Sequence, residues 1–517
     1  MTLDYNAPPP PFRAEDQVPL LDSEASQTRQ PKKPLPPQNP PIIVEERTYH
    51  DRWASALFSI VMLTFVILVY LGVPRAFEPS QPSMPGGGNA TRRDENPVNR
   101  GLNDVGIILS TSILAAFGYS IGYLSLLQHN AKFLIDLSFI LPIVGAVLSS
   151  IICLVNNIVA GAVVWGIIAL LFWWVFASLR PRLRVSAIVL ATVSTILRRF
   201  SGTFVVSGFS GFIWLIFSMV WSLTSSGLKH FGDENPDVAP YVAAYMLFIF
   251  FWVTALLLDI THLTVSGTIA SYFFTGVQDA ESGNVILPVT NVTAMSLKRT
   301  LTTSFGSVCF SSLLSSAVQT LKAVLRSNHE QNVDENKSLF VILISSCLLC
   351  LVSILGDILD FFNKYSLTHI AIYGKNYCDA GRDTWEMFKY KGIDVIVNDC
   401  VVGKVMGMGM AFSILLCGFG GAFASCAVRR VFVPVDESQE IMILFFGISV
   451  ICNMLVAAVV FNFVVKVVDS AAAAMYVCLA EDPATIQKFQ PELFGMIEDV
   501  YPEVTWGMQS IAYTPSA

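Results

Sequence analysis

The chain has 517 residues, of which 53% are hydrophobic and only 14% are charged, and its mean hydropathy is +0.58. Soluble proteins carry about 25% charged residues, so this composition predicts an all-α protein that crosses a membrane several times. The formal charge of −7 leaves no broad basic surface for nucleic acid. Eight of the ten cysteines lie in apolar or helical stretches, which excludes a disulfide scaffold.

Proline is frequent in residues 1–50, and we expect this segment to be a disordered cytosolic tail. Residues 51–467 are expected to form a ten-helix transmembrane domain, and residues 468–517 an acidic cytosolic tail. The predicted spans lie at about 53–73, 103–127, 134–155, 158–179, 203–226, 240–273, 303–326, 339–362, 404–427 and 441–466.

Arginines mark the orientation of the chain in the membrane. Residues 180–200 carry arginines at both ends of only 13 uncharged residues, too few to cross a bilayer, so we expect an interfacial helix on the cytosolic face. Short loops rich in arginine stay inside, which places both termini in the cytosol. The loop with the sequon at Asn89 then lies outside, which predicts a glycosylation site. Residues 363–403 are expected to be a cytosolic loop with short helices.

The span at about 240–273 carries a polar stripe. Tyr245, Trp252, Asp259 and Ser266 are seven residues apart and share one helix face, with His262 one turn after the acid. Ionisable groups at this depth are costly and usually face a bundle interior or a wet cavity. The stripe therefore indicates a pathway for a solute. The alternative is that the acid and the imidazole satisfy only each other and a neighbouring helix.

Two further groups of residues are candidates for a pathway. Trp214 and Trp221, seven apart on one span, are a possible second aromatic wall, with three tryptophans of the preceding span as alternatives: Trp165, Trp173 and Trp174. Tryptophans are common at both membrane interfaces, which gives them an ordinary explanation. Asp357 and Asp360 are a possible cytosolic gate, unless they are solvated at the interface or pair with Lys364.

The loop after the eighth predicted span carries a specific motif. Residues 363–378 read NKYSLTHIAIYGKNYC, which resembles the signature of the choline transporter-like family. Three other segments are similar to family motifs: 267–274 (GTIASYFF), 297–314 (LKRTLTTSFGSVCFSSLL) and 468–482 (VDSAAAAMYVCLAED). The short loop after the first span and the wording TWEMFKYKGIDVIVNDCVVG favour the fungal branch, the "pH nine sensitive" proteins.

The resemblance implies ten spans, cytosolic termini and transport of choline or a similar small organic cation across the plasma membrane. A quaternary ammonium has no proton to donate, so aromatic faces and a nearby carboxylate are the groups that bind it. Tyr245, Trp252 and Asp259 have this chemistry on one helix. His262 is a possible pH-coupling group, or else a buried neutral histidine.

A second hypothesis comes from a different class of function. The Pro-rich and acidic tails suit a membrane scaffold or stress-tolerance protein that recruits cytosolic partners without transporting a solute. The sequence has no HExxH motif, nucleophile elbow, P-loop or Cys/His metal spacing, so we expect neither an enzyme nor a cofactor.

Overall fold

The fold is described from a computed structural model. The structure describes residues 48–76, 97–155, 159–234, 237–278, 285–287, 291–334, 338–391, 394–432 and 439–482, together with residues 487 and 495. The expected Pro-rich tail up to residue 47 and the sequon at Asn89 lie outside these residues, so both stay predictions.

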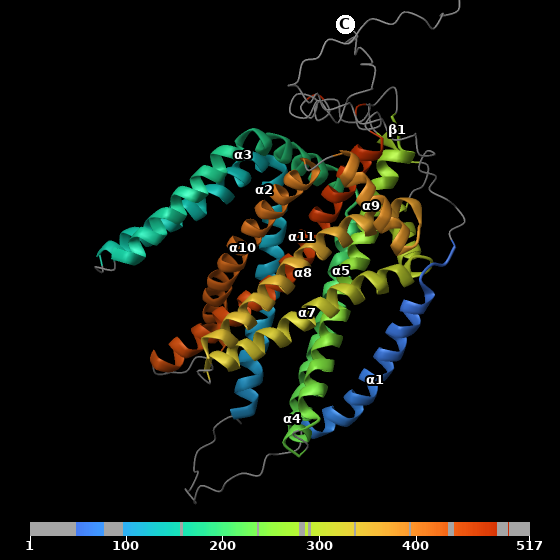
Figure 1. The fold of residues 1–517 in the computed structure, drawn as a ribbon. Coiled ribbons are helices and arrows are strands. Elements are labelled where there is room, and N and C mark those ends of the chain that lie inside the picture. Colours follow the sequence, from blue (N-terminus) through green and yellow to red (C-terminus); the bar gives the residue numbers. More distant parts are fainter. Residues whose placement is uncertain are drawn as a thin grey trace, which may run out of the picture. The chain divides into compact units, whose positions relative to one another are not determined.

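The described residues are helical apart from one short ladder between α5 and α6, where β1 (Val277–Gln278) pairs with β2 (Val285–Ile286) in antiparallel register. The helices are shown in Figure 1 and are α1 (Arg52–Ala76), α2 (Pro97–Val155), α3 (Val159–Arg199), α4 (Gly202–Glu234), α5 (Ala239–Thr275), α6 (Val292–Leu301), α7 (Phe305–Asp334), α8 (Leu339–Tyr373), α9 (Tyr377–Lys391), α10 (Asp394–Phe432) and α11 (Gln439–Glu481).

Seven helices in the described part of the chain are long and apolar enough to cross a membrane: Arg52–Pro74, Gly202–Leu228, Ala239–Thr275, Phe305–Val333, Phe340–Tyr373, Met406–Arg430 and Met442–Glu481. They agree with seven of the ten predicted spans. The count of ten and the cytosolic position of the termini stay predictions.

The difference lies in α2 and α3. The two spans predicted at 103–127 and 134–155 belong to one helix of 59 residues, α2. The polar residues between them keep their backbone donors, so they can continue the helix, and Pro142 further along also lies inside it. Within α2 and α3, the apolar stretches Ile140–Val155 and Gly161–Trp174 are shorter than the other spans.

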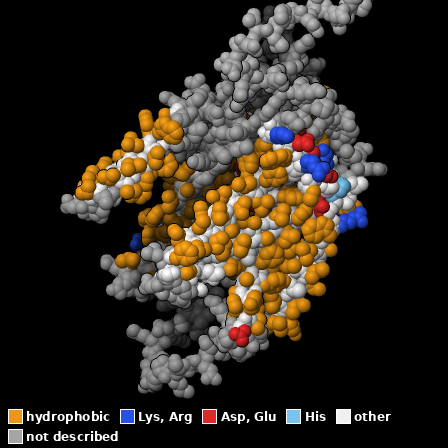
Figure 2. Space-filling model, viewed as in Figure 1, with side chains coloured by type: hydrophobic (Ala, Val, Ile, Leu, Met, Phe, Trp, Pro, Cys, Tyr) orange, Lys and Arg blue, Asp and Glu red, His pale blue; other side chains and the backbone are white. Residues whose placement is uncertain are grey.

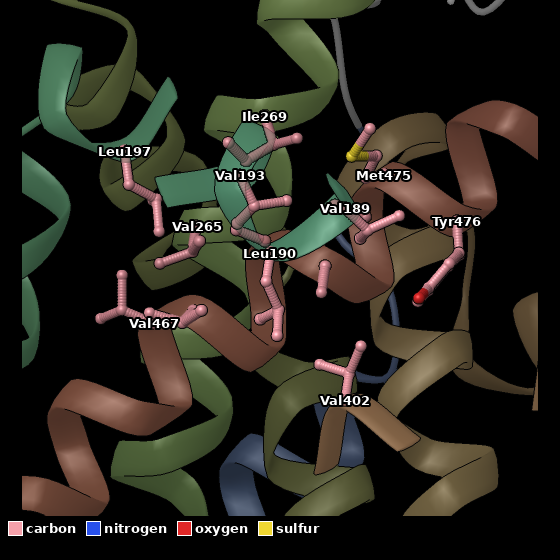
Figure 3. Packing of buried hydrophobic residues seen from close by; sticks show 14 of the residues in the cluster. Val189, Leu190, Val193, Leu197, Val265, Ile269, Val402, Val467, Met475 and Tyr476 are labelled. Carbon is pink, nitrogen blue, oxygen red and sulfur yellow. The ribbon is translucent and has the colours of Figure 1, made fainter. Parts of the chain in front are cut away.

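We expected the Arg-flanked segment 180–200 to be a separate helix. Instead, residues 180–199 form the second half of α3. Four of its apolar side chains are buried in the largest hydrophobic cluster, against residues of α5, α10 and α11 (Figure 3): Val189, Leu190, Val193 and Leu197. Its position at the cytosolic face stays a prediction. An interfacial helix would turn these side chains towards lipid, whereas here side chains of other helices cover them.

The end of α11 shows a similar difference. We expected the acidic segment from residue 468 to begin as an extension of the last helix into the cytosol, and α11 does continue to Glu481. The difference is that this part is deeply buried, so it is not a solvated tail. The four alanines 471–474 are completely buried, and such small side chains allow neighbouring helices to approach closely in a membrane protein. Figure 3 shows Val467, Met475 and Tyr476 of this stretch inside the cluster.

The family signature forms the turn between α8 and α9. Gly374 ends α8 in the left-handed conformation, with φ 68°, and its amide donates to the carbonyl of Ile370 at 2.8 Å. Asn376 caps α9, because its Oδ1 accepts from the amide of Asp379 at 2.7 Å. The expected loop at 363–403 is therefore mainly helical, with its first residues in α8 and its last in α10.

The outer surface agrees with a membrane environment. Figure 2 shows that the face over α7 and α8 is almost entirely hydrophobic, with charged side chains gathered at one end near α9. On α8 the exposed apolar residues include Leu343, Leu351, Leu355 and Ile358. An apolar band of this kind suits the hydrocarbon region of a bilayer.

Candidate functional site

Helix α5 lies at the centre of the candidate site, in contact with α4, α7, α8 and α11. Its second half, from Ile260 to Phe273, is buried at almost every position, including polar residues such as Thr261, Thr264 and Thr268. The three threonine hydroxyls donate to backbone carbonyls one turn earlier, which satisfies them within the helix. The polar groups of α5 that are not satisfied within the helix are therefore the candidates for the functional site.

The two aromatic residues of the predicted stripe contact α1 and α7. Tyr245 is half-buried and hydrogen-bonds the Thr64 hydroxyl of α1. Trp252 is 1% exposed; its Nε1 donates to Ser312 Oγ of α7 at 3.2 Å, and its ring packs against Phe58 and Phe248. In this conformation protein side chains cover the Trp252 ring, so a role as a cation-binding wall requires a rearrangement and stays a prediction.

The proposed second wall lies on a different face of α5. Trp214 Nε1 donates to Thr254 Oγ1 at 2.9 Å, and Trp221 Nε1 donates to the Met246 carbonyl at 2.8 Å. Both rings contact Phe250. Thr254 is five residues before Asp259, which separates the two by about 140° around the helix. The structure thus places these tryptophans together, but not beside the acid.

One turn of the stripe is fully hydrogen-bonded. His262 is completely buried; its Nδ1 contacts Ser470 Oγ of α11 at 2.8 Å, and its Nε2 contacts the Lys364 carbonyl of α8 at 2.8 Å. Because a carbonyl only accepts, Nε2 carries the proton. Lys364 Nζ binds Asp469 Oδ1 at 2.7 Å, and these side chains are 10% and 20% exposed. We call His262, Lys364, Asp469 and Ser470 the paired level.

The preceding turn has a different character. Asp259 of α5 is half-buried, and its Oδ2 is buried without a hydrogen bond. The charges of Lys466 on α11 and Asp360 on α8 act on it, and the Ser311 hydroxyl on α7 is near enough to interact with it, although outside hydrogen-bond geometry. Ser311 is completely buried, and its Oγ also makes no hydrogen bond. We call Asp259, Lys466, Asp360 and Ser311 the open level.

The two levels are one helical turn apart on the same three helices. Asp259 precedes His262 on α5, Asp360 precedes Lys364 on α8, and Lys466 precedes Ser470 on α11. Residues three or four apart lie above one another on a helix face, so the three helices run in the same direction here. The bond between His262 and Ser470 fixes this register.

A chain of hydrogen bonds connects the open level to α9. Ser315 Oγ donates to Asp360 Oδ1 at 2.9 Å, and Asn363 Nδ2 donates to Ser315 Oγ at 2.9 Å. The Tyr377 hydroxyl donates to Asn363 Oδ1. Burial, and secondarily the negative charge of Asp259, raises the pKa of Tyr377 above its usual range, so this hydroxyl keeps its proton and donates.

The predicted gate residues are both exposed. Asp360 belongs to the open level, whereas Asp357 makes no hydrogen bond or ion pair with a described residue. Lys364 binds Asp469, and the expected alternative, that the two acids pair with Lys364, stays a prediction. Sequence reasoning did not assign Lys466 or Asp469 to the site. The feature of the sequence that could have revealed them is the interruption of an apolar run by charged residues in VVKVVDS, residues 464–470.

No group of three or more His, Cys, Asp or Glu residues with metal-binding geometry occurs in the described ranges. The site is instead one of isolated charges, hydroxyls and an imidazole inside a bundle of apolar helices. Such an arrangement defines a class: a polytopic α-helical membrane protein with ionisable residues between its helices. This chain belongs to the plasma-membrane choline transporter family, whose match covers residues 163–484.

Individual relatives support this membership over most of the chain. A CTL-like protein of Dictyostelium discoideum is 29% identical, covering 88% of this chain and 75% of the relative. The protein PNS1 of Gibberella zeae is 26% identical, covering 88% and 83%. The protein PNS1 of Kluyveromyces lactis is 26% identical, covering 97% and 92%. The similarity to the fungal branch is confirmed.

Proposed function

We propose that this protein is a plasma-membrane transporter or facilitator of choline or a related small organic cation, with Asp259 as the residue that attracts the cation. Membership of the plasma-membrane choline transporter family supports the substrate class. The observation that carries the proposal is the open level, where a carboxylate inside a membrane span has a buried oxygen without a hydrogen bond.

The energetic argument concerns the cost of this arrangement. An ionised carboxylate away from water is expensive unless hydrogen bonds or an ion pair stabilise it. The paired level, one turn away, meets this need for Asp469 with a direct ion pair, so the fold is able to supply one. Asp259 has no direct ion pair with a described residue, and a substrate cation would supply the missing counter-charge.

The chemistry of the surroundings fits a cation that cannot donate hydrogen bonds. The site offers Asp259, the exposed acid Asp360 and the buried hydroxyl of Ser311, with the ring of Tyr377 close enough for the charge of Asp259 to act on it. A quaternary ammonium binds through its charge and through aromatic faces, at about 0.5–2 kcal/mol per ring. Trp252 and Tyr245 would contribute after a rearrangement of α1 and α7.

The test is uptake by purified protein in liposomes, with radiolabelled choline and a panel of other small cations. We expect Asp259→Asn to reduce choline uptake to the level of protein-free liposomes, because the amide keeps the shape and removes the charge. Asp237→Asn is the matched control, since Asp237 is exposed and precedes α5. Equal uptake by the Asp259 variant and the wild type would remove this residue from the pathway.

The same assay separates the alternative function. A scaffold or stress-tolerance protein would be folded in the liposomes and would move none of the cations. That result, with correctly folded wild-type protein, would overturn the transport proposal as a whole.

A further inference from the structure

We propose that Lys466 is a tethered competitor of the substrate cation: its ammonium compensates the open level when the site is empty and moves away when substrate binds. This inference rests on the proposed function. It concerns a lysine inside a candidate membrane span, where a charged side chain is costly and needs a reason.

The register of the helices places Lys466 opposite the acid. Ser470, one turn further along α11, contacts His262, and its Oγ lies 2.5 Å from the Lys466 carbonyl oxygen. Asp259 is one turn before His262 on α5. Since α5 and α11 run in the same direction here, Lys466 and Asp259 lie at the same level of the bundle.

The partners of the neighbouring charges leave Lys466 as the cation without a direct bond. Lys364 already binds Asp469 at 2.7 Å. Lys466 is half-buried and makes no hydrogen bond or ion pair with a described residue, yet its charge acts on Asp259, Asp360 and Asp469. Lys364 is thus held in place by Asp469, whereas Lys466 acts on all three carboxyl groups without a bonded partner among the described residues; Lys322 acts on Asp360 alone.

The chemistry of lysine suits a movable counter-charge. Its ammonium is a compact point charge on a flexible four-carbon arm, so it can approach or leave a carboxylate without a movement of the backbone. A substrate ammonium carries the same unit charge and would compete with it for Asp259. The attraction between Lys466 and Asp259, which the substrate must overcome, lowers its apparent affinity in the same way as any competing ligand.

The experiment compares Lys466→Gln, Lys466→Arg and the wild type by the KM of choline uptake in liposomes. Lys298→Gln is the matched control, because Lys298 is exposed on α6. We expect Lys466→Gln to lower the KM by about two- to fivefold, the effect of losing one partly solvated charge that competes with the substrate for Asp259. Lys466→Arg retains the charge and should keep the wild-type KM within about twofold.

Two outcomes would overturn the competitor role while leaving the transport proposal intact. One is a wild-type protein that transports choline and a Lys466→Gln variant with an unchanged KM. The other is a raised KM, which would mean that Lys466 positions Asp259 for the substrate. Loss of uptake in the wild type itself would instead refute the proposed function.

A second measurement needs no variant and therefore does not depend on its folding. Amine methylation of purified wild-type protein, read by mass spectrometry, reports the exposure of Lys466 with and without choline. Displacement predicts more labelling of Lys466 in the presence of choline and no change at Lys298. Equal labelling of Lys466 under both conditions would contradict displacement.

Discussion

The paired level and the open level both place acidic and basic side chains on α5, α8 and α11, yet they differ in how their charges are satisfied. At the paired level Lys364 binds Asp469 directly and both nitrogens of His262 have partners. At the open level Asp259 and Lys466 are one turn away and make no direct bond. A charge inside the membrane is thus structural where it has a bonded partner, and the unbonded charge is the candidate for function.

The largest effect is expected from a variant that disrupts the paired level. Asp469→Asn removes one partner of a mostly buried ion pair, the carboxylate that Lys364 binds at 2.7 Å. Such a change costs about 3–5 kcal/mol of unfolding free energy. Denaturation of the purified protein in mixed micelles measures the loss.

Asp259→Asn is the matched comparison for this prediction, because it removes the same charge one turn away. The open level has no direct ion pair to lose, so the unfolding free energy of this variant should change by less than about 1 kcal/mol. Equal destabilisation by the two variants would show that the levels do not differ in the way their geometry indicates.

A smaller effect is expected from His262→Leu. The variant loses the contacts of the imidazole with Ser470, the Lys364 carbonyl and Thr368, which costs about 1–3 kcal/mol. The loss is limited because Thr368 donates to the Lys364 carbonyl and, without the imidazole, the Ser470 hydroxyl can donate to the Lys466 carbonyl. Since both ring nitrogens have protein partners, the pH profile of choline uptake should remain that of the wild type. A profile that flattens in the variant would identify His262 as the pH-coupling group.

The sequence alone predicts the part of the site that lies on α5 but not the part that lies on α11. The spacing of Tyr245, Trp252 and Asp259 on one apolar helix is enough to predict a stripe. Lys466 falls at the end of a predicted span, where a lysine is normally explained by its extension to the membrane surface. Only the packing of α11 against α5 and α8 shows that residues 466–470 lie inside the bundle.

The helix boundaries show the same limit of local reasoning. Hydropathy locates apolar stretches, so seven predicted spans agree with helices of the structure. It does not say whether the residues between two apolar stretches leave the helix, which is why α2 is one helix where we expected two. Residues 186–197 and 468–481 are also helical and mostly buried, because distant parts of the chain cover them.

The smallest expected effect concerns Asp357, the outer member of the gate predicted from the sequence. Asp357 is exposed and acts on Asp360 only through its charge, whereas Asp360 accepts a hydrogen bond from Ser315 at 2.9 Å. Exposed charges interact weakly, so Asp357→Asn should change both unfolding free energy and uptake little, by about 0.5 kcal/mol or less and about twofold or less. Asp360→Asn, which also weakens the chain from Asp360 through Ser315 and Asn363 to Tyr377, should reduce uptake further. An uptake defect at Asp357 as large as that at Asp360 would extend the open level by one more turn and place the gate there. The reason is that Asp357 has no bonded partner among the described residues, so its charge would then act on the passing cation.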